Sequence, residues 1–309
     1  METRIDAGAL AALHARLSAL EESPAACEEG EFLARAEAMD ELELGVCLPL
    51  ESFGSATEGA GQPDACGDLS EFRRRADSLL ARWEALDDSL FRGLRIALRG
   101  ARDPGAAFRS LLETYLPRRA FDGMRVGPGY DARDAFLSGL LYASPIPAPI
   151  QPLEPGMVQL QNTPVRILLE LIEKSAISPS DTFFDIGSGL GQVPLVVHLL
   201  TGARAIGIER EPAYVGYARE LAADFGLPDV RYRISDARAA DYSEATALFL
   251  YTPFRGPMLE TVLERIRGQC RTGARMFTYG PGTAEIARHE WLKPMWSIPK
   301  DGLGGFALA

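Results

Sequence analysis

The sequence has few of the residues that hold metal ions or disulfide frameworks. Its 309 residues include four cysteines and three histidines. The cysteines form no C-x-x-C pair and the histidines are scattered along the chain, so a structural zinc site and a disulfide framework are both disfavoured. We therefore expect no metal. Reduced thiols are typical of the cytosol, which predicts a cytoplasmic protein.

Long apolar runs are also missing. The apolar stretches are interrupted well before the roughly 18 residues that a membrane-spanning helix needs. Residues 1–6 are not followed by the apolar core of a secretion signal. We therefore expect neither a membrane segment nor a membrane partner.

Positive charge is scarce as well. The chain has three lysines and a net charge of −11 at pH 7, and residues 1–50 hold eleven acids against three arginines. Binding to nucleic acid depends largely on lysine and arginine side chains that neutralise phosphates. We therefore expect no nucleic-acid partner.

The sequence does contain a glycine-rich turn after a short apolar stretch. Residues 182–186 have the aromatic and β-branched content of a buried strand, and residues 192–200 predict a helix. Between them stand Gly187, Gly189 and Gly191, which let the backbone turn sharply and approach a ligand at the start of the helix. The fingerprint of hydride-transferring enzymes is G-x-G-x-x-G, and Gln192 occupies its third glycine position here. A dinucleotide site is therefore disfavoured.

Acidic residues stand at the ends of three predicted strands. Asp185 lies near the end of the first strand, Glu209 follows it by 24 residues and ends the second, and Asp236 follows the third, residues 230–234. The carboxyl ends of parallel strands face the ligand crevice of an open α/β sheet. A carboxylate at Glu209 can accept hydrogen bonds from ribose hydroxyls, and one at Asp236 can accept a hydrogen bond from the amino group of adenine.

The glycines, spaced G-x-G-x-G two residues after Asp185, resemble the first motif of class I S-adenosylmethionine (SAM) methyltransferases. Across about residues 142–280 the chain is most similar to the Dot1-type protein-lysine methyltransferases. The resemblance is carried by DIGSGLGQV from Asp185, Gly207-Ile-Glu209, Asp236, and a loop from Tyr142-Ala-Ser-Pro to Asn162-Thr163.

The resemblance implies a fold, a cofactor and a set of cofactor contacts. The fold is α/β: a Rossmann-like, seven-stranded class I methyltransferase sheet with an N-terminal helical domain. The cofactor is SAM, with S-adenosylhomocysteine as product. The implied cofactor-binding residues are Thr163, Asp185, Gly187, Ser188, Gly189, Gly191, Gln192, Glu209, Arg210, Asp236, Ala237 and Tyr251. Ala237 stands where the family usually has an aromatic ring, and Tyr251-Thr252 replaces a pair of asparagines.

The candidate catalytic residues follow the fourth predicted strand, residues 246–250. They are Tyr251, Thr252, Pro253 and Phe254. Tyr251 and Phe254 are interpreted as walls of an apolar channel, which favours a neutral amine through desolvation, and Thr252 as an acceptor for the amine's hydrogen bond. In an alternative interpretation, Pro253 and Phe254 only end the strand and pack against the next helix. The four residues also resemble the Asn/Asp-Pro-Pro-Tyr/Phe element of enzymes that methylate amide or adenine nitrogens, but without its initial amide or acid.

Three segments are predicted. Residues 1–141 form a helical domain, residues 142–162 a proline-rich loop that is either a linker or a lid, and residues 163–309 the SAM-binding domain. Five prolines in residues 143–156 exclude a regular helix or central strand there. Thr163 is predicted to cap the helix that follows. Residues 274–279 predict a fifth strand, and residues 291–298 and 304–309 an antiparallel pair.

We therefore expect a SAM-dependent methyltransferase that transfers a methyl group in line to an amine, such as a protein lysine. One alternative is a small-molecule methyltransferase with the N-terminal helices as its lid. Another is a non-catalytic SAM-binding sensor or scaffold. The expected partner is a protein or small-molecule methyl acceptor, and the sequence leaves the oligomeric state open.

Overall fold

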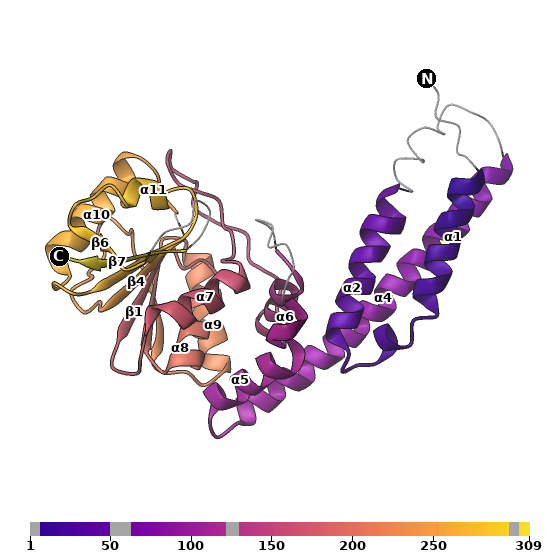
Figure 1. Cartoon of the computed structure of the whole chain (residues 1–309), viewed down its shortest axis with the longest axis horizontal. Helices are drawn as coiled ribbons and strands as arrows, with labels where there is room; N and C mark the ends of the chain where they lie inside the picture. Colours follow the sequence, from indigo (N-terminus) through magenta and orange to yellow (C-terminus); the bar gives the residue numbers. More distant parts are fainter. Residues whose placement is uncertain (1–6, 50–62, 122–129, 252, 297–302) are drawn as a thin grey trace. The chain divides into compact units, whose positions relative to one another are not determined.

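The computed structural model describes residues 7–49, 63–121, 130–251, 253–296 and 303–309 (Figure 1). By its contacts the chain divides into two compact units, Met1–Arg95 and Ile96–Ala309. None of the helices within the described residues is both long and apolar enough to cross a membrane.

The first unit is helical. It contains α1 (Ala7–Glu21), α2 (Phe32–Leu42) and most of the long helix α4 (Pro63–Gly100), with a short 3-10 turn, η1 (Ala25–Cys27), and a π-helical turn, η2 (Glu43–Cys47). Its core is built from residues of all these elements, including Leu17, Ala26, Leu42, Val46, Phe72 and Trp83. Residues 1–95 hold 20 of the 43 acidic and 9 of the 32 basic residues, so the net charge of −11 resides entirely in this unit.

A buried ion pair joins the helices of this unit. The fully buried Arg35 on α2 donates from Nε to Asp87 Oδ1 on α4 at 2.7 Å. Its Nη1 and Nη2 atoms donate to the carbonyl oxygens of Glu28 and Glu29 at 2.7 and 3.2 Å. Burial raises the pKa of Asp87, while Arg35 opposes that shift. The guanidinium is thereby paired and hydrogen-bonded inside the core, as a buried charge requires.

The second unit is built on a seven-stranded sheet. Its strands are β1 (Thr182–Ile186), β2 (Arg204–Glu209), β3 (Val230–Ile234), β4 (Ala247–Leu250), β5 (Arg275–Thr278), β6 (Leu292–Pro294) and β7 (Gly304–Leu308). The strand order is β3-β2-β1-β4-β5-β7-β6, and β7 runs antiparallel to both of its neighbours while the other pairs are parallel. The predicted Rossmann-like, seven-stranded α/β fold is therefore confirmed.

Helices cover both faces of this sheet. They are α5 (Pro104–Tyr115), α6 (Ala132–Leu141), α7 (Val165–Ser175), α8 (Gln192–Thr201), α9 (Pro212–Asp224), α10 (Pro257–Gln269) and α11 (Thr283–Ile286), with a 3-10 turn, η3 (Arg118–Phe121). In Figure 1, α7, α8 and α9 lie on one face, and α10 and α11 on the other.

The division of the chain falls at Arg95, whereas the predicted helical domain extends to residue 141. The difference arises because α5 packs on α8 and α6 packs on α7, so both helices belong to the unit of the sheet. Arg109 of α5 also donates to the carbonyl oxygen of Leu199 on α8 at 3.4 Å. The apolar pattern of a helix does not reveal which partner it packs against.

The prediction that Thr163 caps α7 is wrong. The residue before the helix is Pro164, and no side chain of its own caps the helix start. The N–H of Val165 donates instead to Asp134 Oδ1 on α6 at 2.8 Å. A carboxylate from another helix therefore satisfies the open N–H group that a local cap would have met.

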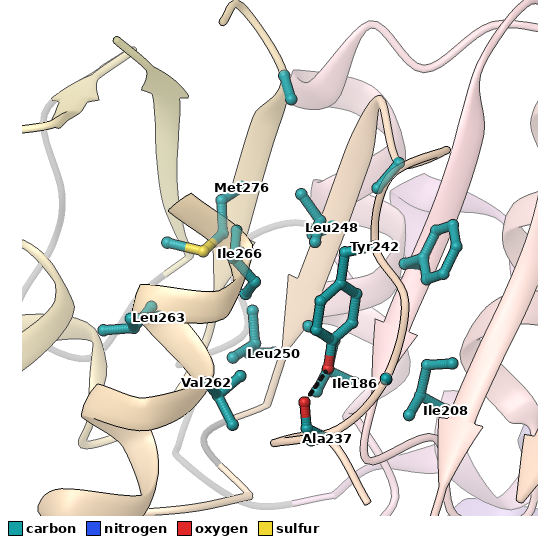
Figure 2. Packing of buried hydrophobic residues seen from close by; sticks show 14 of the residues in the cluster. Ile186, Ile208, Ala237, Tyr242, Leu248, Leu250, Val262, Leu263, Ile266 and Met276 are labelled. Carbon is teal, nitrogen blue, oxygen red and sulfur yellow. Dashed lines mark hydrogen bonds between the residues drawn. The ribbon is translucent and has the colours of Figure 1, made fainter. Parts of the chain in front are cut away.

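The apolar cluster between the sheet and α10 supports the end of β3. Leu248, Leu250 and Met276 of the sheet pack against Val262 and Ile266 of α10 (Figure 2). The buried Tyr242 lies in this cluster, and its hydroxyl donates to the carbonyl oxygen of Ala237 at 2.8 Å. A core side chain, that of Tyr242, therefore holds the loop after β3 in place.

Candidate functional site

Three carboxyl groups meet at the carboxyl ends of adjacent strands. Asp185 lies near the end of β1, Glu209 ends β2, and Asp236 follows β3 by two residues. These strands are neighbours in the sheet, in the order β3-β2-β1. All three residues line one cavity of about 270 Å³. The acids predicted from the sequence therefore converge.

The glycine turn forms one wall of this cavity. Gly187, Gly189 and Gly191 have φ angles of +83°, +50° and +87°, in the left-handed region that residues with a Cβ rarely adopt. A Cβ at Gly187 would lie 2.8 Å from Pro253, and one at Gly189 would lie 2.5 Å from Leu160. The open N–H groups of α8 begin directly after the turn.

Glu209 ties the end of β2 to the glycine turn. Its Oε2 accepts a hydrogen bond from the N–H of Gly189 at 2.9 Å. Its Oε1 accepts from the N–H groups of Arg210 and Glu211 at 2.7 and 2.8 Å. A carboxylate has about four lone-pair sites. Glu209 can therefore hold the turn and still accept a hydroxyl donor from a ligand.

Asp185 is a buried acid on the cavity wall, 4% exposed. Burial, and secondarily the charge of Glu209, raises its pKa well above the ordinary value of 3.8. Strongly perturbed acids in clefts mark candidate functional sites. A ligand that brings a positive charge or a hydrogen-bond donor to this carboxyl would stabilise its ionised form.

Asp236 is held by an arginine two residues away. Its Oδ1 accepts from the N–H and Nε of Arg238 at 2.8 and 2.9 Å, and its Oδ2 accepts from Nη2 at 2.5 Å. This arginine lowers the pKa of Asp236, against the smaller effect of burial. Asp236 is therefore an ionised acceptor at the cavity.

At the opposite end of the glycine turn lie Gln192 and Thr163. The buried Gln192 donates from Nε2 to the carbonyl oxygen of Thr163 at 3.1 Å, and both residues line the cavity. The Ser188 hydroxyl lies close to Gly207 of β2, where a Cβ would come within 2.5 Å of its Oγ.

The proline-rich segment, residues 142–162, is called the strap below. Its second half lines the cavity. Glu211 Oε2 accepts from the N–H groups of Ile150 and Gln151 at 3.0 and 2.8 Å. Further along, the N–H of Val158 donates to the carbonyl oxygen of Pro253 at 3.1 Å. Backbone contacts thus hold the strap to the loops after β2 and β4.

The loop after β4 supplies the aromatic end of the cavity. Tyr251, Pro253 and Phe254 line it, whereas Thr252 lies outside the described residues. Phe254 also belongs to the apolar core and forms a β-bridge with Met157 of the strap. It therefore has both of the roles that the sequence left open, a cavity wall and a packing residue.

Tyr251 packs against a second tyrosine. Its ring centroid lies 5.0 Å from that of Tyr279. The Tyr279 hydroxyl accepts a hydrogen bond from Arg166 Nη2 at 3.0 Å. Burial raises the pKa of Tyr251 to about 12. Tyr251 is therefore a neutral phenol at neutral pH.

The structure brings most of the predicted residues together. The cavity is lined by Thr163, Asp185, Gly187, Ser188, Gly189, Gln192, Glu209, Arg210, Asp236, Ala237, Tyr251, Pro253 and Phe254. Gly191 lies behind the wall, against Ala218 and Tyr232. The described residues contain no group of three histidine, cysteine or acidic side chains that could hold a metal ion.

Sequence reasoning missed the strap's side chains and part of the β2–α9 loop. The missed lining residues are Pro149, Gln151, Pro152, Leu153, Met157, Val158, Gln159, Leu160, Gln161, Asn162, Val193, Ile208, Glu211, Tyr214 and Ser235. The run of prolines signals an extended segment, but nothing in it indicates which side chains face a ligand.

Comparisons with known proteins give similarities of structure alone. No family model matches the chain, and no curated protein matches it. An RNA methyltransferase from Salinibacter ruber, solved with S-adenosylhomocysteine, is 26% identical with a TM-score of 0.40, over 48% of this chain and 92% of that chain.

Two further solved structures are similar over shorter spans. The YcgJ protein of Bacillus subtilis is 16% identical with a TM-score of 0.34, over 37% of this chain and 50% of that chain. Geranyl diphosphate C-methyltransferase from Streptomyces coelicolor A3(2) is 18% identical with a TM-score of 0.36, over 43% of this chain and 62% of that chain. This chain therefore covers less than two thirds of the length of each of these two proteins.

Proposed function

We propose that this protein is a SAM-dependent methyltransferase that binds its cofactor in the cavity at the ends of β1, β2 and β3. The observation that carries the proposal is the convergence of Asp185, Glu209 and Asp236 on one cavity whose wall includes two positive-φ glycines, Gly187 and Gly189. Acids at neighbouring strand ends suit a nucleoside, and a glycine turn at a helix start suits close approach of a ligand.

The described residues fit this cofactor. Gly187 and Gly189 line the cavity with backbone alone, and Pro253 and Leu160 pack so closely on them that a Cβ would not fit. Glu209 would accept a hydrogen bond from a ribose hydroxyl, and Asp236 one from the adenine amino group. The glycine turn, Gln192 and Thr163 would hold the methionine end. When bound, SAM supplies an electrophilic methyl group on a sulfonium.

The methyl acceptor that suits the aromatic end best is an amine, a protein lysine in the first place. Tyr251 lines the cavity and packs on Tyr279, and an aromatic ring at this position can attract a substituted ammonium by cation–π interaction. The apolar wall of Pro253 and Phe254 favours the neutral amine by desolvation, because a lysine of ordinary pKa about 10.4 must lose its proton first. The enzyme's remaining task is to align the amine with the methyl and exclude water.

The decisive experiment supplies SAM carrying a labelled methyl group to the purified protein and a cell lysate. Label in protein bands supports a protein-lysine acceptor if acid hydrolysis of those bands releases the label as methyl-lysine. Label in small molecules alone supports the small-molecule alternative. Binding of SAM without any labelled product supports the sensor or scaffold. The Glu209→Ala variant serves as the control for cofactor-dependent labelling.

A further inference from the structure

A single carboxylate of the strap bridges two arginines from different strand ends. Glu154 Oε1 lies 3.0 Å from Nη2 of Arg210, which follows β2. Its Oε2 lies 3.0 Å from Nη2 of Arg238, which follows β3. The three side chains are about one-third exposed, so both ion pairs meet solvent.

Each arginine is anchored in the cavity wall. Arg238 makes three hydrogen bonds to Asp236, the acid at the end of β3. Arg210 donates from Nη1 to the carbonyl oxygen of Pro152 at 3.1 Å. The same Nη1 atom also donates to Met157 Sδ at 3.3 Å. Through these two side chains, Glu154 is connected to the nucleoside end of the cavity.

The middle of the strap depends on this carboxylate. Backbone hydrogen bonds hold its flanks, at residues 150–151 to Glu211 and at residues 156–158 to the loop after β4. Between them, Pro152 and Pro155 have no N–H to donate. Pro152 and Leu153 nevertheless line the cavity. The backbone bond from the Met157 N–H to the Glu154 carbonyl oxygen, at 3.0 Å, stays within the strap. The polar contacts that join this stretch to the strand ends are those of the Glu154 carboxylate with Arg210 and Arg238, and of the Pro152 carbonyl with Arg210.

We propose that Glu154 is a positioning residue that latches the strap over the nucleoside end of the cavity and thereby sets how fast a nucleoside ligand leaves. The identity of that ligand as SAM or S-adenosylhomocysteine rests on the proposed function. Pro152, Leu153 and Met157 wall the cavity, so a bound nucleoside that leaves on this side must displace the strap. Displacing the strap breaks both ion pairs of Glu154.

The test measures the dissociation rate of labelled S-adenosylhomocysteine from the full chain carrying Glu154→Gln. We expect dissociation to be about three- to tenfold faster, as two partly exposed ion pairs allow. Raising NaCl from about 50 to 500 mM should speed dissociation from the unaltered protein toward the variant's rate, because salt screens exposed pairs, and should change the variant little.

Glu244→Gln is the matched control. Glu244 also bridges two arginines of the same strands, Arg204 of β2 at 3.2 Å and Arg233 of β3 at 3.5 Å, but it does not line the cavity. Its dissociation rate should equal that of the unaltered protein. If Glu154→Gln fails to fold, Glu154→Asp replaces it, because a side chain one methylene shorter cannot reach both arginines, and the same acceleration is expected.

Two negative results are distinguishable. If the unaltered protein binds S-adenosylhomocysteine and the Glu154 variants release it at the same rate, the latch is refuted while the proposed function stands. Equal acceleration by Glu244→Gln refutes the latch as well, because the effect is then one of general stability. If the unaltered protein binds neither SAM nor S-adenosylhomocysteine, the proposed function itself fails.

Discussion

The hydroxyl of Tyr232 donates a 2.7 Å hydrogen bond to the carbonyl oxygen of Gly191. Tyr232 belongs to β3, so a side chain from the edge of the parallel region holds the last glycine of the turn after β1. Burial raises the pKa of Tyr232 well above its ordinary value, which keeps the hydroxyl protonated as the donor.

This contact predicts that Gly191→Ala disrupts the cavity. A Cβ at residue 191 would lie 2.7 Å from both Tyr232 and Ala218, and φ there is +87°. We expect at least a tenfold loss of S-adenosylhomocysteine affinity by calorimetry, because a non-glycine residue in this region costs about 1–3 kcal/mol before the clash is added. The control is Gly216→Ala on α9, where a Cβ meets no atom within 4 Å; it should leave affinity unchanged.

Asp185→Asn should stabilise the ligand-free protein at neutral pH and weaken cofactor binding. The folded-state pKa of Asp185 is raised, so the folded state holds this proton more tightly than the unfolded state. Stability from this group therefore falls as pH rises from about 3.8 through the raised pKa. Thermal melts of both proteins at several pH values test this. A stability advantage of Asn that grows toward low pH would contradict it.

Glu209 is expected to matter to both the fold and the ligand. In Glu209→Ala, the N–H groups of Gly189, Arg210 and Glu211 lose their acceptor, which should cost about 1–3 kcal/mol of unfolding free energy. SAM affinity should fall by at least about tenfold, because ribose hydroxyls would also lose their acceptor. Glu209→Gln keeps one side-chain oxygen, so its stability and SAM affinity should lie between those of the unaltered protein and of Glu209→Ala. Unchanged affinity in the alanine variant would remove Glu209 from the site.

Tyr251 is expected to affect turnover more than cofactor binding. Because its pKa is about 12, the hydroxyl cannot serve as a general base at neutral pH. Tyr251→Phe should therefore keep activity within a few fold and leave the pH profile unchanged. Tyr251→Ala removes the ring that packs on Tyr279 and should lower kcat by about tenfold or more, with KM for SAM nearly unchanged. A parallel loss of SAM affinity would assign Tyr251 to the cofactor wall instead.

In the first unit, Arg35→Met should destabilise the helical core strongly. It leaves Asp87 without its buried partner, and loss of one member of a buried pair costs about 3–5 kcal/mol. Chemical denaturation followed by circular dichroism measures the loss. The double variant Arg35→Met/Asp87→Leu should recover much of it, because no unpaired charge remains. A double variant as unstable as the single one would show that packing of the Arg35 stem dominates.

Local pattern was enough to place the parallel strands and the glycine turn. Residues 182–186 were expected as a strand and form β1 with those bounds, and the turn glycines have the positive φ angles that their lack of a Cβ permits. Strand ends could be placed near one another because parallel strands share a carboxyl edge. The antiparallel pair was also found, as β6 and β7, although its residues 297–302 lie outside the described part of the chain.

The sequence by itself thus determined which residues form the strands and that three acids stand at their ends, since these features depend on spacing along a few residues. Only the tertiary structure decided that Glu154 meets Arg210 and Arg238, which lie 56 and 84 positions away, and that α5 and α6 belong with the sheet. A contact between distant segments does not change the spacing of apolar residues in either segment, because it depends on where the fold places the two residues and not on their neighbours in the chain.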